Sequence, residues 1–167
     1  MKKIFFALFG ATTLWSCSPK MSPLTSITTD PVMVESTLSK EAVWEKLVDH
    51  MAVVGTTIKL IDKASGLIVT DDYSFINSWT YENKKGVQKN PSAFVAIKKR
   101  GGRAPQTITG QWNARVKDKP GGGSIININL VNLKAYRVDV SKYGSSYTNY
   151  SVGSNQVFEK AMADKIK

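Results

Sequence analysis

Cys17 is the only cysteine of this 167-residue chain, so the thiol chemistry of the protein rests on one side chain. A basic start at residues 2–3 is followed by an apolar run at residues 4–14, and small Ser16 stands directly before the cysteine. This order is typical of a secretory signal peptide, because the apolar run is too short to span a bilayer. The sequence therefore predicts a cleavage that leaves Cys17 at the N-terminus of the mature protein.

The residues Leu14-Trp15-Ser16-Cys17 resemble the lipobox of bacterial lipoprotein precursors that signal peptidase II processes. The resemblance implies that residues 1–16 are removed and that Cys17 carries a diacylglycerol thioether and an acylated amine, with fatty acids such as palmitate. Two or more acyl chains hold a protein stably in a membrane. In lipoprotein sorting, Ser18 after the cysteine favours the outer membrane. The alternatives are an ordinary signal peptide with a chance cysteine and a buried N-terminal helix.

No other residues show the spacing of a catalytic or metal site. His50 is the only histidine, and a metal site or a His-dependent triad needs further ligands or an oriented base. Asp71 and Asp72 are adjacent, and adjacent strand residues point to opposite faces of a sheet. The glycines at 101–102 and 121–123 do not stand in the Gly-x-x-x-x-Gly-Lys-Ser/Thr order of a phosphate-binding loop. We expect no enzymatic activity, no metal and no cofactor.

The first candidate binding site is a basic loop with four cations. Such a cluster attracts anionic lipid headgroups or an acidic partner. The alternative is a solvated turn whose charges protect neighbouring strand ends against aggregation. The four residues are Lys98, Lys99, Arg100 and Arg103.

The second candidate binding site is a segment in which Tyr143, Tyr147 and Tyr150 lie among Ser, Gly, Asn and Val. Tyrosines among small polar residues are typical of contact surfaces, since a rigid aromatic side chain provides much contact area at little entropy cost. The alternative is that these rings close the edge of a sheet over the core. The sequence predicts the segment itself as a polar loop.

The charge of the chain narrows the class of partner. The chain has 23 Lys and Arg against 13 Asp and Glu, a formal net charge of +10. Loss of Lys2 and Lys3 with the signal leaves 21 against 13, or +8. A basic exported domain is attracted to phosphate-rich membrane surfaces. Nucleic acid is not expected as a partner, because an exported chain does not normally meet it and the sequence contains no nucleic-acid-binding motif.

Three parts are expected along the chain: a signal peptide at 1–16, a lipidated tether at 17–28 and a single domain at 29–167. The tether contains Pro19 and Pro23 with several Ser and Thr, and it shows no apolar periodicity. This composition predicts an extended segment. The rest of the chain is long enough for one hydrophobic core.

Apolar periodicity predicts an amphipathic helix near each end of the domain. Ser39 is a suitable N-cap for the first helix, and Gly55 is suited to its C-terminal end. The second helix is expected to begin near Ser154 or Asn155, with Glu159 facing water. The apolar stripe of the first helix comprises Val43, Trp44, Leu47, Val48, Met51 and Val54, and that of the second comprises Phe158, Met162 and Ile166.

Alternation of apolar and polar residues predicts an antiparallel sheet with one solvated face. The alternation is strict at residues 108–117 and resumes at 126–130 after a turn at 120–123. Residues 74–90 fit either a strand or a projecting loop. Shorter strands are expected at 29–35, 57–61, 67–70 and 93–98, with a hairpin connection at 62–66.

Helices at both ends of an antiparallel sheet predict an α+β fold with two layers. The helix with Val43-Trp44, the hairpin Asp62-Lys63-Ala64-Ser65-Gly66-Leu67-Ile68 and the closing helix around Phe158-Glu159 resemble the helix-grip domains of BamC-type lipoproteins. Those are accessory parts of the outer-membrane β-barrel assembly machinery. The resemblance spans about residues 39–167. This chain does not contain that family's long second domain or its partner-binding N-terminal segment, so the resemblance implies a fold rather than a role.

The sequence thus predicts a non-enzymatic lipoprotein of the bacterial cell envelope that acts as an accessory or scaffold binding module for an envelope protein complex. A solvated sheet face and a Tyr-rich segment provide surface without clustered chemistry. The alternative is a carrier of a small lipid or glycan. A deep apolar cavity lined by Trp44, Trp112 and Phe158 would support the carrier, and a filled core would oppose it.

Overall fold

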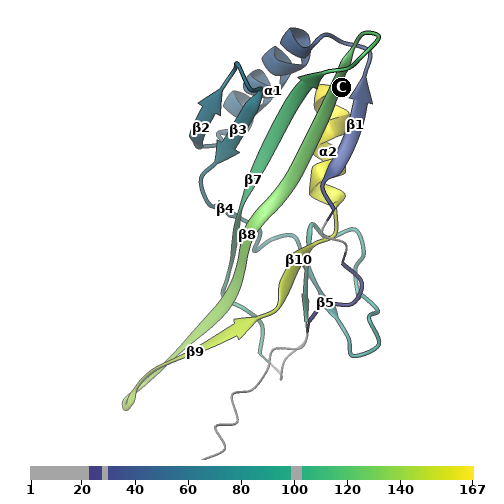
Figure 1. Cartoon of the computed structure of the whole chain (residues 1–167). Coiled ribbons are helices and arrows are strands. Elements are labelled where there is room, and N and C mark those ends of the chain that lie inside the picture. The colour runs from purple at the N-terminus through teal and green to yellow at the C-terminus, as the bar shows by residue number, and fades with distance from the viewer. Residues whose placement is uncertain (1–22, 28–29, 99–102) are drawn as a thin grey trace, which may run out of the picture.

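The computed structural model describes residues 23–27, 30–98 and 103–167 (Figure 1). Cys17, Lys99 and Arg100 therefore lie outside the described residues. The elements follow the chain as β1 (Val32–Ser36), α1 (Lys40–Val54), β2 (Ile58–Asp62), β3 (Leu67–Thr70), β4 (Tyr73–Ser74), β5 (Trp79–Glu82), β6 (Val95–Lys98), β7 (Thr107–Asp118), β8 (Ser124–Ser141), β9 (Gly144–Tyr150), β10 (Val152–Ser154) and α2 (Val157–Ile166).

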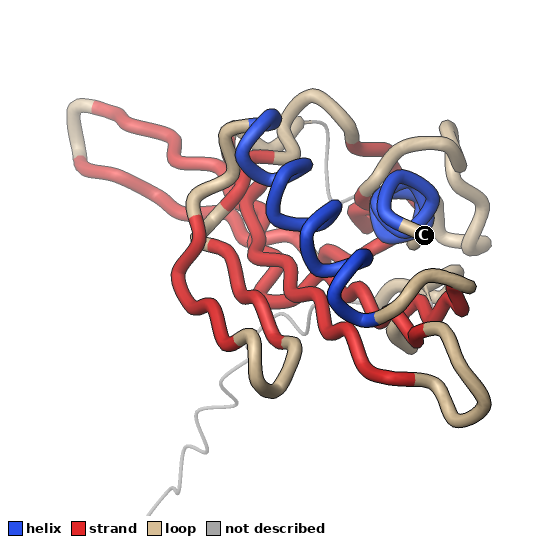
Figure 2. Tube along the Cα trace, turned by 90° about the horizontal axis from the view of Figure 1, so that it is seen from above, coloured by secondary structure: helices blue, strands red, loops and turns tan. Residues whose placement is uncertain are grey.

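The larger sheet has the strand order β1-β8-β7-β3-β2, with β4 added beside β7 and β9 beside β8. Every pairing within it is antiparallel. Both helices cover one face of this sheet (Figures 1 and 2). The expected α+β class with helices on a mostly antiparallel sheet is confirmed.

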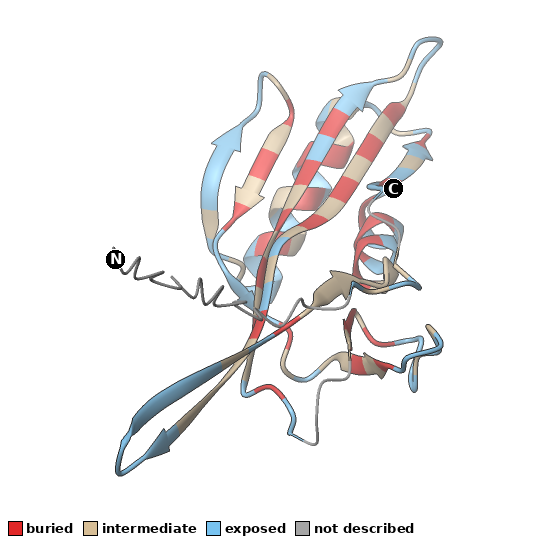
Figure 3. Ribbon diagram, turned by 60° about the horizontal axis from the view of Figure 1, so that its bottom comes forward, coloured by how far each residue is buried: buried red, intermediate tan, exposed pale blue. Residues whose placement is uncertain are grey.

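The core is built on the strict alternation of β7 and β8. Trp112 lies opposite Leu130 and Ala114 opposite Ile128, and all four side chains point to the helices and are buried. Their sequence neighbours on the other face are half-exposed or exposed, as the striped strands in Figure 3 show. The alternation predicted from the sequence is therefore the pattern that separates the core from the solvated face.

Helix α1 begins and ends where its caps predict. The Ser39 hydroxyl accepts the N–H of Ala42 at 3.2 Å, and Gly55 adopts the left-handed conformation at φ 67°. The assignment of Val54 to the apolar stripe is wrong, because this side chain is 50 % exposed. It is the last residue of the helix, directly before the Gly55 cap. The buried members are Val43, Trp44, Leu47 and Met51.

Helix α2 begins at Val157, two to three residues after the predicted start. The prediction that Glu159 faces water is wrong, because the residue is only 2 % exposed. Its carboxylate accepts a hydrogen bond from the Ser154 hydroxyl at 2.6 Å and one from the Leu130 N–H at 3.3 Å. The helical period alone does not reveal such burial, since the hydrogen-bond partners lie on strands β8 and β10.

Gly66 ends the predicted hairpin connection between β2 and β3, and its position requires glycine. Its φ is +70°, and a Cβ atom there would lie 2.0 Å from the carbonyl oxygen of Val116. The Gly66 carbonyl accepts the N–H of Val116 at 2.8 Å. Glycine therefore lets this turn lie directly against β7.

A second sheet, with the order β10-β6-β5, lies beside the end of the larger one. Strands β5 and β6 run parallel, and β10 is antiparallel to β6. The sequence predicted a strand at 93–98, where β6 lies, but no second sheet. Residues 79–82 form strand β5, which resolves the choice between strand and loop for part of the segment 74–90.

Candidate functional site

The Tyr-rich segment forms a two-stranded ribbon, so its prediction as a polar loop is wrong. Strand β8 continues beyond Tyr136, the last residue that pairs with β7, and from there it pairs only with β9. The ribbon, defined here as residues 137–148, projects from the body of the domain (Figures 1 and 3). Such a ribbon gains little from core packing, and isolated two-stranded hairpins are only marginally stable in water.

Large apolar side chains at the far part of the ribbon are solvent-exposed. Tyr143 is 87 % exposed, Val140 is 79 % exposed and Tyr147 is 71 % exposed. The ammonium group of Lys142 lies 4.8 Å from the centre of the Tyr143 ring. Within the described residues, no further strand pairs with the outer edge of β9. The far part of the ribbon thus presents Tyr143 and Tyr147 to solvent.

Tyr150 lies at the base of the ribbon and has the other role considered from the sequence, in which the ring closes the edge of the sheet over the core. It is 4 % exposed, and its hydroxyl donates a 3.0 Å hydrogen bond to the carbonyl of Arg103. It therefore closes the sheet over the core and does not share the exposed surface of Tyr143 and Tyr147. The three tyrosines that the sequence grouped together have two different environments.

A charge cluster around Asp139 lies at the root of the ribbon. Arg103 and Arg137 each contact the same carboxylate oxygen of Asp139 at 2.8 Å. The hydrogen bond from Arg137, together with the nearby charge of Arg103, lowers the pKa of Asp139 below its usual value. Arg103 was predicted as part of a binding loop, and in the structure it links that loop to the ribbon.

Lys98, the other described member of the basic loop, lies in the second sheet. Its ammonium group is 2.6 Å from Glu82 Oε1, and its side chain is only 12 % exposed. Lys98 is thus an ion-pair partner of a buried carboxylate. Contact between this loop and anionic headgroups stays a prediction, since Lys99 and Arg100 lie outside the described residues.

Glu82 was not among the site residues predicted from the sequence. It is fully buried and accepts hydrogen bonds from the backbone N–H groups of Thr25 and Ser26, both at 3.0 Å, and from both of their hydroxyls. Residues 25 and 26 belong to the segment predicted as an extended tether. The alternation of Trp79 and Tyr81 with Thr80 and Glu82 predicts the aromatic side chains on the buried face, so this pattern gave no sign that Glu82 is buried.

The environment of Glu82 keeps it ionised. Burial by itself raises the pKa of the carboxyl group. The hydrogen bonds from Lys98, Ser26 and the backbone of Thr25 and Ser26 outweigh this effect and lower the pKa to about 2. The carboxylate therefore joins the second sheet to the chain just before β1.

The residues considered for catalysis or metal binding do not form a site. Asp71 and Asp72 are both exposed, and His50 is half-buried on α1. In the described part of the chain, no three His, Cys, Asp or Glu side chains are placed to hold a metal ion. Trp44, Trp112 and Phe158 pack within one hydrophobic cluster, so the space between helices and sheet is filled. This filling opposes a lipid or glycan cavity at that place.

Neither helix in the described ranges is long and apolar enough to cross a membrane. Comparison of the chain with protein-family models and with curated proteins found no match.

Proposed function

We propose that this protein is a lipid-anchored lipoprotein of the bacterial cell envelope, held in the outer membrane through Cys17. Its α+β domain is a non-enzymatic binding module that serves as an accessory or scaffold of an envelope protein complex. The ribbon of β8 and β9 is the part that contacts the protein partner.

The ribbon is the observation that carries this proposal. Tyr147 lies in the β8–β9 ladder opposite Val138, and Tyr143 lies in the turn that joins the two strands. Exposed tyrosines supply large contact areas with few rotatable bonds. Within the described residues no further strand lies along β9 at residues 145–148, and such an edge suits the addition of a strand from another protein. At the root, the Asp139 cluster joins the ribbon to Arg103.

Two further features support the proposal. The order of residues 14–17 fits lipidation at Cys17, and the described segment at residues 23–27 leads from that side of the chain into the domain. The likeness to helix-grip domains of BamC-type lipoproteins rests on the capped helix α1, the β2–β3 hairpin and the closing helix α2. An accessory role in an envelope assembly is consistent with the exposed ribbon, with lipidation at Cys17 and with the likeness to helix-grip domains.

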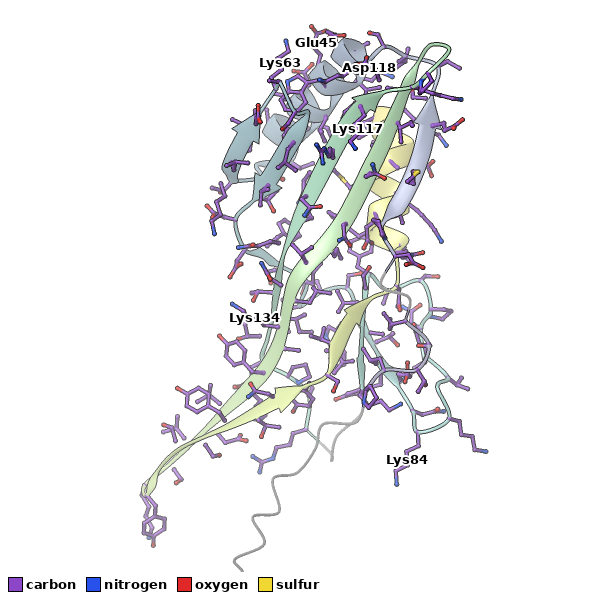
Figure 4. The ribbon with its side chains drawn as sticks, in the orientation of Figure 1. Glu45, Lys63, Lys84, Lys117, Asp118 and Lys134 are labelled. Atoms are coloured by element: carbon purple, nitrogen blue, oxygen red, sulfur yellow. The ribbon has the colours of Figure 1, made fainter. Side chains whose placement is uncertain are left out.

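Site-specific photo-crosslinking in the organism's own membranes tests the proposal. A photoreactive phenylalanine analogue replaces Tyr143 in the full chain, and the matched control carries it at Glu45, an exposed position on α1 distant from the ribbon (Figure 4). We expect one discrete protein adduct from position 143 and none from position 45. The adduct should also weaken when Tyr147→Ser is added.

Equal adducts from both positions, or an adduct that is insensitive to Tyr147→Ser, would show that the ribbon is not the partner-binding surface. The Cys17→Ala variant should lose the adduct as well, because the proposal places the partner at the membrane.

A further inference from the structure

An open groove of about 580 Å³ lies at the junction of the larger sheet, the second sheet and the start of α2. Leu24 and Ile27 of the N-terminal segment line it, together with Val152 on β10 and Leu130 and Leu133 on β8. Its volume is in the range typical of small-molecule sites. This groove is distinct from the filled space between helices and sheet.

Glu159, which also lines the groove, is a buried carboxylate with one unused oxygen. The hydrogen bonds from Ser154 and Leu130 both reach Oε1. Oε2 is buried and has no hydrogen-bond partner within the described chain. Buried polar atoms without a partner are uncommon in native proteins and often mark a site that a ligand, ion or water completes.

Two other residues that line the groove have an unusual backbone conformation. Asn132 at φ 53° and Gln156 at φ 62° are the non-glycine residues with positive φ in the described ranges, and both line the groove. Asn132 belongs to a bulge in β8, where the register with β7 shifts opposite Gly110. Bulges and left-handed residues occur preferentially beside functional sites.

The charged side chains that line the groove favour a cationic ligand. Glu159 and Asp30 are the charged residues among its described lining, and no Lys, Arg or His lines it. No described salt bridge neutralises Glu159. A buried carboxylate in a low-dielectric site attracts a cation that also donates hydrogen bonds. This acidic groove stands out in a chain whose formal net charge is +10.

We propose that the groove binds a small amphipathic amine. The primary ammonium group is held by the charge of Glu159, and the apolar body of the ligand lies between Leu24 and Ile27 on one side and Val152 on the other. Because the N-terminal segment supplies one wall, the ligand also contacts the segment that Glu82 fastens to the second sheet.

Titration of the full chain in a zwitterionic detergent with n-butylammonium, n-butanol and n-butyrate tests the proposal. Methyl NMR signals of Ile27, Leu133 and Val152 report binding in the groove. We expect n-butylammonium to bind at least about tenfold more tightly than n-butanol, and n-butyrate not to bind. Glu159→Gln should remove the preference for the amine, while Glu45→Gln on the exposed face of α1 should leave it unchanged.

A second variant distinguishes the contribution of the apolar wall to affinity from that of the charge. Leu24→Ala with Ile27→Ala alters only the N-terminal segment, and it should weaken n-butylammonium and n-butanol equally while preserving the preference for the amine. Equal affinity for the amine and the alcohol in the unmodified protein, or a preference that survives Glu159→Gln in a folded variant, would overturn the proposal. Absence of any methyl shift up to about 10 mM amine would show that the groove holds water only.

Discussion

Lys98 and Glu82 are register partners in the parallel β5–β6 pair, with 2.6 Å between the ammonium nitrogen and Oε1. The same carboxylate accepts hydrogen bonds from Thr25 and Ser26, 57 and 56 residues away in sequence. One buried charge therefore connects three separate parts of the chain. This arrangement makes Glu82 a structural centre of the second sheet.

Removing the cation from this pair should be costly. Lys98→Ala leaves a buried carboxylate without its counter-charge, and we expect a loss of about 3–5 kcal/mol in the free energy of unfolding. Lys134→Ala, at an exposed residue of β8 (Figure 4), should change it by less than about 0.5 kcal/mol. Urea denaturation measures both. Equal effects would show that the hydrogen bonds from Thr25 and Ser26 suffice to hold Glu82.

Acid should weaken the fold through Glu82. The pKa of this group is about 2 in the folded protein, against an ordinary value of 4.5. Below pH 4.5 the unfolded chain takes up the proton first, so the stabilisation is complete above that pH and is lost as the pH falls toward about 2. Glu82→Gln should show a shallower decline over this window in urea denaturation. Parallel curves for the two proteins would contradict the role of the group.

Leu47 tests the buried face of α1. It is fully buried, and Leu47→Ala should lower the free energy of unfolding by about 2–5 kcal/mol through lost burial and the cavity left behind. Glu45→Ala on the exposed face should cost less than about 0.5 kcal/mol. Chemical denaturation measures both losses. Similar losses would show that the buried face of α1 is wrongly assigned.

The tyrosines at the two ends of the ribbon should behave differently. Tyr150→Phe removes the donor to the Arg103 carbonyl and should cost about 1 kcal/mol. Tyr143→Phe changes an exposed ring and should be neutral within about 0.5 kcal/mol. Thermal or urea unfolding measures the free energy of unfolding of both variants. A larger loss for Tyr143→Phe than for Tyr150→Phe would mean that the tip of the ribbon packs against the domain.

The proposed lipid anchor requires Cys17. Cys17→Ala should abolish incorporation of labelled fatty acid and leave either an uncleaved precursor or a soluble form. Ser18→Ala is the matched control, and it should still be labelled. A Cys17→Ala protein that remains labelled and cleaved would show that the lipobox assignment is wrong.

Local patterns in the sequence were sufficient for the elements whose environment repeats along the chain. Strands β7 and β8 alternate because one face meets the helices and the other meets water, and this period is visible in residues 108–117 without any knowledge of partners. The caps of α1 were equally predictable, since Ser39 and Gly55 act within one turn of the helix.

The tertiary structure alone decided the features that depend on distant partners. Glu159 follows a helical period that predicts exposure, and it is buried because strand β8 and Ser154 meet it. Glu82 is a buried ion only because β6 and the N-terminal segment surround it. The ribbon formed because a second strand pairs with the polar extension of β8, so no apolar pattern marked it. Non-local hydrogen bonds and charges have no sequence period, and for that reason these residues could not be placed from the sequence.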